Sequence, residues 1–325
     1  MKGGAVIEAA AKVSKVAFDK TGTLTHGRPQ VTDLVPFGHT TEAQLLEVAA
    51  GVESGSSHPL AVAILNRAET AGVPALPARD ARALAGRGVV ATVGDAPAWV
   101  TSPRHASENG GLDELGLRQA TMFEEQGKTA VAVYREGIPL GLIAMRDEPR
   151  ADAAEAVRQL SAMGITSTIL TGDNPRTAAA IAEGLGMQFQ ADMMPEDKLS
   201  AIREMNEQGG VMMIGDGIND APALKQASIG VAMGSGTDVA LETADAAILR
   251  DRVTDIAAQI RLARAAMTNI RQNVTIALGL KVVFLVTTVL GITGLWIAIL
   301  ADTGATVLVT LNALRLLGFN PEREG

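Results

Sequence analysis

The sequence contains no cysteine and no excess of basic residues. Without cysteine, the chain can form neither a disulfide bond nor a thiolate metal site of its own. The formal net charge of −8 at pH 7 offers no basic surface for nucleic acid, so we expect no nucleic-acid partner. No signal peptide is recognisable at Met1. With 325 residues, 47% of them hydrophobic, the chain has material for about two domains with substantial cores.

The most informative segment is Phe18–Thr25, with the sequence FDKTGTLT. It follows a short β-branched stretch, Val13–Phe18, that predicts a strand. Asp19 would then lie at the carboxyl end of a strand, where open α/β sheets bind ligands, and Gly22 would let backbone N–H groups converge on a phosphoryl group. An aspartate in this setting can act as a nucleophile. Taken alone, Asp19 could also simply cap a turn.

Three further motifs place polar residues after an apolar strand or at the start of a helix. In Ile169–Asn174 the hydroxyl of Thr171 can bind phosphate, and Pro175 predicts the start of a helix. Lys198, in the segment 193–198, can neutralise developing negative charge. In Met212–Pro222, Asp216 offers Mg²⁺ a hard oxygen ligand.

Together, in this order and spacing, the motifs resemble the haloacid dehalogenase-type phosphorylation domain of P-type ATPases. The resemblance implies that Asp19 is the phosphorylated nucleophile and that Thr171 and Lys198 contact phosphate. It also implies Mg²⁺ binding by the Asp19 carboxylate, the Thr21 carbonyl and Asp216. The other catalytic residues that the matching motifs imply are Lys20, Gly172, Asp173, Asn219 and Asp220.

The residue two positions after the nucleophile separates pumps from phosphatases of this fold. Soluble relatives have a second aspartate there as general acid and base, whereas this chain has Thr21. Without that carboxylate, the aspartyl phosphate should persist long enough to drive a conformational change. A transport ATPase is therefore favoured over a soluble phosphatase.

Between Arg28–Pro29 and about Met145 the pattern indicates an inserted domain. Helices are predicted over 41–50 and 59–71, strands over 89–93, 130–135 and 139–144, and a hairpin turn at Glu136–Gly137. His58–Pro59 could merely begin a helix, with Gly86 and Gly88 in a loop. The arrangement also resembles the nucleotide-binding domain of heavy-metal (type IB) P-type ATPases, which implies ATP binding by Glu53, His58, Gly86 and Gly88.

Two apolar segments follow, Val274–Leu290 and Leu295–Leu317, joined by a turn at 291–294. Each is near the ~20 residues that a membrane-spanning helix needs. Arginines flank the outer ends and the turn carries no charge, so both chain ends should be cytoplasmic. A buried hairpin in a soluble protein is the alternative, but helices so apolar all round are rare outside membranes.

Lys281 and Asp302 interrupt the two apolar segments, and ionisable residues inside a membrane usually have a function. Counted from the turn, their depths differ by roughly 3 Å, so they could pair across the hairpin. A purely structural ion pair is one interpretation. With Asn273 and Asp302–Gly304, however, they resemble the zinc, cadmium and lead branch of the family. That resemblance implies that Asp302 is a ligand of the transported metal and Lys281 its partner.

The expected fold is therefore α/β: a haloacid dehalogenase-type Rossmann-like phosphorylation domain with an inserted α+β nucleotide-binding domain, followed by a two-helix transmembrane hairpin. The expected boundaries are 1–28 and 146–268 for the phosphorylation domain, 29–145 for the insert, 269–317 for the hairpin and 318–325 for a tail. Family members also have an actuator domain, six further membrane helices and a Cys-Pro-Cys metal site, none of which is found here.

The resemblance thus predicts the C-terminal fragment of an ATP- and Mg²⁺-dependent pump of the bacterial plasma membrane, with its catalytic domains in the cytoplasm. Its expected partners are a divalent heavy-metal ion, the lipid bilayer and the missing N-terminal half of the pump. Two other interpretations stay open at this point: a soluble phosphatase, and a non-catalytic nucleotide-binding module of a membrane complex.

Overall fold

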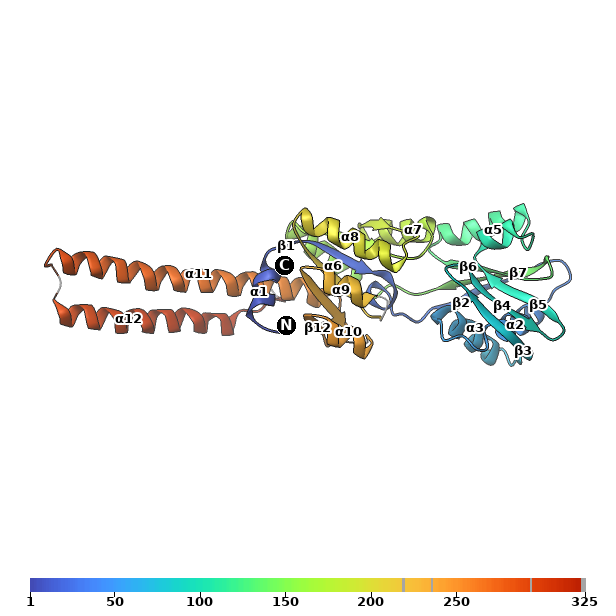
Figure 1. Cartoon of the computed structure of the whole chain (residues 1–325), viewed down its shortest axis with the longest axis horizontal. Coiled ribbons are helices and arrows are strands. Elements are labelled where there is room, and N and C mark those ends of the chain that lie inside the picture. The colour runs from blue at the N-terminus through green and yellow to red at the C-terminus, as the bar shows by residue number, and fades with distance from the viewer. Residues whose placement is uncertain (218–219, 235, 293, 323–325) are drawn as a thin grey trace.

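In the computed structural model, two α/β units and a helical hairpin lie in a line, with the N-terminus near the base of the hairpin (Figure 1). The structure describes residues 1–325 except 218–219, 235, 293 and 323–325. It also leaves the side chains of five residues in the second arm of the hairpin undescribed, which are Leu295, Ala298, Ile299, Ala301 and Asp302.

The first unit, called the parallel unit below, is a six-stranded sheet in the order β12-β11-β10-β1-β8-β9. Its strands are β1 (Val13–Asp19), β8 (Thr166–Leu170), β9 (Gln188–Gln190), β10 (Gly210–Gly215), β11 (Ile229–Met233) and β12 (Ala246–Ile248). All neighbouring strands run parallel. The central strands are almost entirely apolar because helices cover both faces of the sheet. These helices are α6 (Ala153–Ala162), α7 (Pro175–Leu185), α8 (Pro195–Glu207), α9 (Ala221–Gln226) and α10 (Asp238–Thr243).

The second unit, called the antiparallel unit, occupies most of the insert between β1 and β8. Its sheet has the order β2-β7-β6-β5-β4-β3. The strands are β2 (Gln30–Pro36), β3 (Ala78–Leu84), β4 (Gly88–Val93), β5 (Ala96–Thr101), β6 (Thr129–Arg135) and β7 (Ile138–Arg146). Helices α2 (Glu42–Glu53) and α3 (Pro59–Thr70) share one apolar core with this sheet, while α4 (Pro103–Glu108) and α5 (Glu114–Glu125) contribute to another.

The secondary structure predicted for the insert is confirmed where the sequence is periodic, which includes α2, α3, β4, β6 and β7. The hairpin turn at Glu136 and Gly137 is confirmed by their φ angles of 49° and 79°. Three strands, β2, β3 and β5, and two helices, α4 and α5, were not predicted. Strand β3 lies at the edge of the sheet and is largely exposed, so it lacks the alternating apolar pattern of a half-buried strand.

The hairpin consists of α11 (Thr254–Val289) and α12 (Leu295–Leu314), followed by a short 3₁₀ turn at Arg315–Gly318. The apolar segment that begins at Val274 is the second part of a longer helix, because α11 begins at Thr254, inside the parallel unit. There, Ile256, Ala257 and Ile260 are buried in the core of that unit, and α1 (Gly4–Ala11) packs against the same helix. Within the part of the chain that the structure describes, α11 is the one helix long and apolar enough to cross a membrane, and Thr303–Gly318 is a shorter apolar helix.

Candidate active site

Three of the predicted site residues meet at one edge of the parallel sheet. Asp19 is the last residue of β1, and the neighbouring strands β8 and β10 end just before Thr171 and Asp216. Because β1 pairs in parallel with both β8 and β10, their carboxyl ends lie side by side. The strand predicted over Val13–Phe18 is thus confirmed, and the sheet brings the three polar residues together.

Lys198 lies in the first turn of α8 and points at the end of β1. Its ammonium group donates hydrogen bonds to Asp19 Oδ1 at 2.5 Å and to Asp220 Oδ1 at 2.9 Å. Burial tends to lower the pKa of Lys198, but the two carboxylates outweigh burial and raise it. Lys198 is therefore a fixed positive charge beside the Asp19 carboxylate.

Asp19, Asp216 and Asp220 form an acidic cluster whose oxygens lie within 4.8 Å of one another. Burial and the neighbouring Asp220 raise the pKa of Asp19 to about 7, against the opposing effect of Lys198. The same two causes raise the pKa of Asp216 to about 6. A divalent cation would relieve this repulsion, and carboxylate oxygens are the ligands that Mg²⁺ prefers. The cluster therefore fits Mg²⁺.

The loop after Asp19 packs directly against the acidic cluster. Residues Lys20–Leu24 form one irregular turn, in which Gly22 has a φ of 73°. A Cβ atom at Gly22 would lie 1.5 Å from Asp216 Oδ2, so only glycine fits there. Asp216 Oδ2 thus occupies the space that a side chain at position 22 would need, and the backbone of this loop lies against the cluster.

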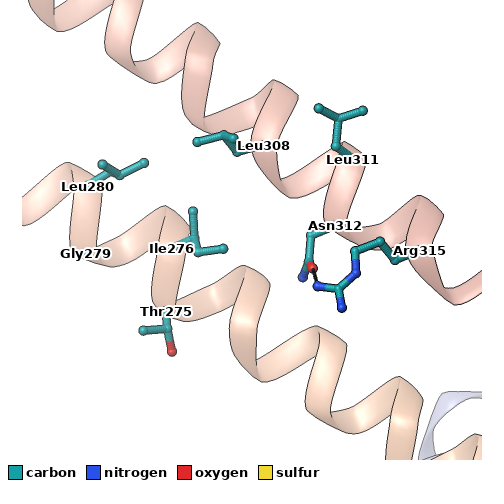
Figure 2. A pocket seen from close by; sticks show the side chains of 8 residues that line it. All are labelled: Thr275, Ile276, Gly279, Leu280, Leu308, Leu311, Asn312 and Arg315. Atoms are coloured by element: carbon teal, nitrogen blue, oxygen red, sulfur yellow. Dashed lines mark hydrogen bonds between the residues drawn. The ribbon is translucent and has the colours of Figure 1, made fainter.

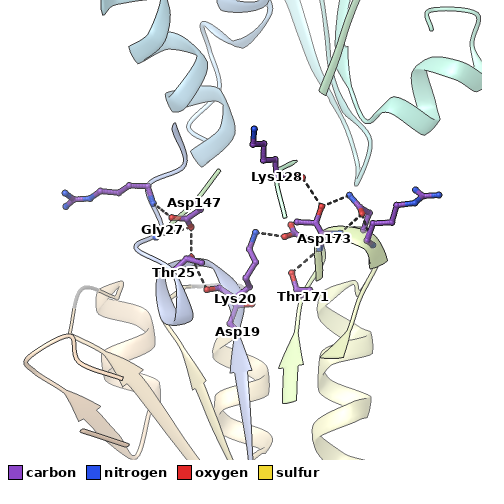
Figure 3. Close-up of polar contacts among 12 residues, drawn as sticks. Asp19, Lys20, Thr25, Gly27, Lys128, Asp147, Thr171 and Asp173 are labelled. Atoms are coloured by element: carbon purple, nitrogen blue, oxygen red, sulfur yellow. Dashed lines mark hydrogen bonds and ion pairs between the residues drawn. The ribbon is translucent and has the colours of Figure 1, made fainter. Parts of the chain in front are cut away.

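The neighbouring loop after β8 is tied to the same turn. Lys20, which is 6% exposed, forms an ion pair with Asp173, as Figure 3 shows. Thr171 is buried, and its hydroxyl accepts a hydrogen bond from the Asp173 N–H at 3.1 Å. Gly172 between them is exposed. The hydroxyl of Thr171 keeps its own proton available to donate to a bound phosphoryl oxygen.

Residues predicted to bind nucleotide lie at two places in the antiparallel unit. Glu53 ends α2 with its side chain buried, and its Oε2 has no hydrogen-bond partner among the described residues. Burial raises the pKa of Glu53 to about 7, with a hydrogen bond to Ser56 opposing the shift. His58 caps α3, its Nδ1 accepting from the Leu60 N–H at 3.3 Å. The capping role weighed in the sequence is thus present, and no described residue forms a hydrogen bond with Nε2.

Gly86 and Gly88 flank the turn between β3 and β4, with φ angles of 67° and 137°. A Cβ atom at Gly88 would lie 2.2 Å from the carbonyl oxygen of Val100, so close packing requires glycine there. At Gly86, the atom of the described residues that it would meet is Met194 Sδ, 4.0 Å away. Met194 directly precedes α8, the helix that holds Lys198, so this loop faces the acidic cluster's side of the parallel unit.

Two predicted residues cannot be placed in the site. Asn219 and the side chain of Asp302 lie outside the described residues. Lys281 lies on α11 within its apolar stretch. The pairing of Lys281 with Asp302 therefore stays a prediction.

Two site residues were missed by sequence reasoning, Asp147 and Arg150, where the chain returns from the insert. Asp147 accepts hydrogen bonds from the Thr25 hydroxyl and from the N–H groups of Gly27 and Arg28. It therefore fixes the segment that leads into β2 (Figure 3). Arg150 is buried and donates to carbonyls of the loop after Asp19. The available signal was a charged cluster, Asp147, Glu148 and Arg150, directly after an apolar strand.

The hairpin contains a separate, mostly apolar groove of about 680 Å³ between α11 and α12. Figure 2 shows Ile276, Leu280 and Leu308 along it, with Asn312 and Arg315 at one end. The acidic cluster contributes nothing to its lining, so the groove is separate from that cluster.

Comparisons with known proteins agree with this geometry. A family model described as haloacid dehalogenase-like hydrolase matches residues 14–228, which is about two thirds of the chain. The chain belongs to the haloacid dehalogenase-like hydrolase family. Within this family it is similar to heavy-metal P-type ATPases: it is 53% identical over 98% of its length to the zinc/cadmium/lead-transporting P-type ATPase of Escherichia coli K12.

This haloacid dehalogenase-like chain is also similar to a solved structure and to a mycobacterial protein. A crystal structure of a zinc-transporting PIB-type ATPase in the E2.Pi state matches 97% of the chain with a TM-score of 0.73 and 52% identity, and the match covers 51% of that structure. A probable copper-exporting P-type ATPase V of Mycobacterium tuberculosis H37Rv is 41% identical over 98% of the chain. The chain spans 43% of the Escherichia coli relative and 42% of the mycobacterial one.

Proposed function

We propose that this chain supplies the ATP-binding, phosphorylation and last membrane segments of a pump that exports Zn²⁺, and with it Cd²⁺ and Pb²⁺, from bacteria. The observation that carries the proposal is the contact of Lys198 with Asp19 inside a cluster of carboxylates. The zinc-transporting relatives support Zn²⁺ as the exported metal. A less similar relative is named a probable copper exporter, so the identity of the metal needs its own test.

In the proposed reaction, ATP binds with its adenine near Glu53 and His58 and its phosphates between the Gly86–Gly88 turn and Asp19. An oxygen of the Asp19 carboxylate attacks the γ-phosphorus. The bond from this phosphorus to the β–γ bridging oxygen breaks, and ADP leaves with that oxygen. Mg²⁺, when held by Asp19, Asp216 and the Thr21 carbonyl, supplies charge neutralisation to the phosphate oxygens.

Side chains around Asp19 stabilise the transferred group and hold the loops of the site. Lys198 neutralises charge that develops on the transferred group, and the Thr171 hydroxyl donates a hydrogen bond to one of its oxygens. Lys20 and Asp173 hold the two loops in register, and Asp220 keeps Lys198 in place. Thr21 has no carboxylate to activate water, so the aspartyl phosphate persists.

The proposed domain organisation follows the predicted boundaries, with the phosphorylation domain in residues 1–28 and 146–268 and the nucleotide-binding domain in 29–145. The hairpin spans the bacterial plasma membrane, with the catalytic domains in the cytoplasm. In the complete pump, Asp302 and Lys281 form part of the route of the transported ion, and an N-terminal half contributes the actuator domain and the remaining helices.

Acid-quenched gels after incubation with γ-labelled ATP and Mg²⁺ test this proposal. A hydroxylamine-sensitive band in the parent that is lost in Asp19→Asn is the expected result. Repeating the experiment with Zn²⁺, with Cu⁺ and with a chelator tests metal coupling. Nucleotide binding without any phosphoenzyme would instead support a non-catalytic module.

A further inference from the structure

Arg150 uses its guanidinium to hold main-chain carbonyls from two distant segments. Nε donates to the carbonyls of Thr23 and Thr25 at 3.0 and 3.2 Å, and Nη2 donates to that of Gly22 at 3.1 Å. Nη1 donates to the carbonyl of Asp251 at 2.9 Å. Arg150 is 8% exposed; its bonds to Gly22, Thr23 and Thr25 are buried, and the bond to Asp251 is partly buried.

The first three carbonyls belong to the loop that begins at the nucleophile. This loop has non-helical backbone angles at Thr21 and Gly22, so it cannot satisfy its carbonyls by a regular helical pattern. A buried carbonyl without a donor is costly, and the planar fork of arginine can serve several acceptors at fixed angles where lysine cannot. Arg150 therefore defines the shape of the loop that presses Gly22 against Asp216.

The fourth carbonyl connects this loop to the hairpin. Asp251 has a φ of 51° and lies just before α11. Two residues beyond Arg150, the Asp152 carboxylate accepts hydrogen bonds from the Thr254 N–H at 3.0 Å and the Thr254 hydroxyl at 3.1 Å, at the first residue of that helix. Residues 150–152 thus contact both the nucleophile loop and the base of α11.

We propose that Arg150 is a positioning residue that sets the geometry of the cation site by tying the nucleophile loop to the base of α11. This inference rests on the proposed function only in taking the acidic cluster as a Mg²⁺ site. If α11 moves relative to the parallel unit, the Asp251 carbonyl moves with it, and the Thr21–Gly22 backbone shifts against Asp216. Cation affinity at the cluster is then coupled to the position of the membrane hairpin.

The test measures binding of Mn²⁺ as a probe for Mg²⁺, followed by the electron paramagnetic resonance signal of the free ion, without ATP. Arg150→Lys keeps the charge and loses the fork, so we expect Mn²⁺ to bind about tenfold more weakly. Arg118→Lys, on the exposed face of α5, is the matched control and should bind like the parent. Thermal unfolding of each variant shows whether it is folded.

A second variant covers the case in which Arg150→Lys does not fold. Asp152→Ala releases the start of α11 without touching the guanidinium, and we expect about threefold weaker Mn²⁺ binding. A folded Arg150→Lys with parental affinity overturns the proposal, as does parental affinity in Asp152→Ala if Arg150→Lys is unfolded. Because the measurement needs no ATP, a parent that binds Mn²⁺ but forms no phosphoenzyme contradicts the proposed function and leaves this inference standing.

Discussion

The ammonium group of Lys198 lies 2.5 Å from a carboxylate oxygen of Asp19, although the two residues are 179 positions apart in the sequence. The second hydrogen bond, to Asp220, fixes the direction of the lysine side chain. The pair places a positive charge where the proposed transfer would create negative charge on a phosphoryl group. This arrangement is typical of electrostatic stabilisation in a buried site.

Replacing Lys198 with methionine keeps most of the side chain's length and removes its charge. We expect phosphoenzyme formation to slow by about 10²–10³-fold, because the charge of the transferred group loses its partner. Stopped-flow or rapid-quench measurement with labelled ATP gives the rate. Lys225→Met, at an exposed position on α9, is the control. Equal rates for the two variants would contradict the role of Lys198.

Gly22→Ala tests the contact between the nucleophile loop and Asp216. The new methyl group would lie 1.5 Å from Asp216 Oδ2, so the loop or the carboxylate must move, and we expect phosphoenzyme formation to be lost. Gly72→Ala is a matched control, because Gly72 also has a positive φ of 68° but no atom of the described residues lies within 4 Å of the added Cβ. The control should lose only about 1 kcal/mol of stability and keep its activity. Retained phosphorylation in Gly22→Ala would argue against this close packing.

Thr21→Asp introduces a carboxylate two positions after the nucleophile. We expect the phosphoenzyme to decay about 10²-fold faster, because the new carboxylate can activate water. The asparagine of Thr21→Asn has nearly the same shape as aspartate but cannot act as a base. The phosphoenzyme of this variant should therefore decay like that of the parent. A chase with unlabelled ATP after labelling measures both lifetimes. Equal decay in the Asp and Asn variants would show that Thr21 does not decide between pump and phosphatase.

The buried Glu53 makes the stability of the antiparallel unit depend on pH. Its pKa is raised from 4.5 to about 7 in the folded chain, so the folded state binds this proton more tightly than the unfolded state does. The stabilising contribution is complete below about pH 4.5 and is lost as the pH rises to about 7. At the upper end the loss is on the order of 2 kcal/mol in the free energy of unfolding.

Glu53→Gln should reduce this pH dependence; Glu124, whose pKa is also raised by burial, and His58, whose pKa is lowered by burial, still contribute to it. Trp99 stacks on Tyr134 in the same unit, with ring centroids 5.1 Å apart, so its fluorescence reports unfolding there. A Trp296→Phe background removes the signal of the hairpin. If denaturation curves of parent and Glu53→Gln change equally with pH, Glu53 does not carry the effect.

The sequence indicated where the polar residues of the acidic site would lie, because their placement follows from the order of the strands. Asp19, Thr171 and Asp216 each come after an apolar strand, and the carboxyl ends of parallel strands meet at one edge of a sheet. Gly22 was predicted to allow a bend, and the structure adds that its missing side chain makes room for Asp216.

Arg150 could not be predicted in the same way. It contacts main-chain carbonyls, which every residue has, so no pattern of side chains in the sequence points to its partners. The edge strand β3 was missed because its exposed residues carry no apolar alternation. The long start of α11 was missed because residues 254–273 mix buried apolar positions with charged ones, whereas the apolar run at 274–290 is conspicuous.

Locating the phosphoryl group by mass spectrometry tests the central claim most directly. The protein is incubated with ATP and Mg²⁺, quenched in acid and treated with hydroxylamine, which converts an aspartyl phosphate to a stable hydroxamate. The account predicts an ATP-dependent hydroxamate at Asp19. Modification at another carboxylate, or none in a protein that still binds nucleotide, would contradict it.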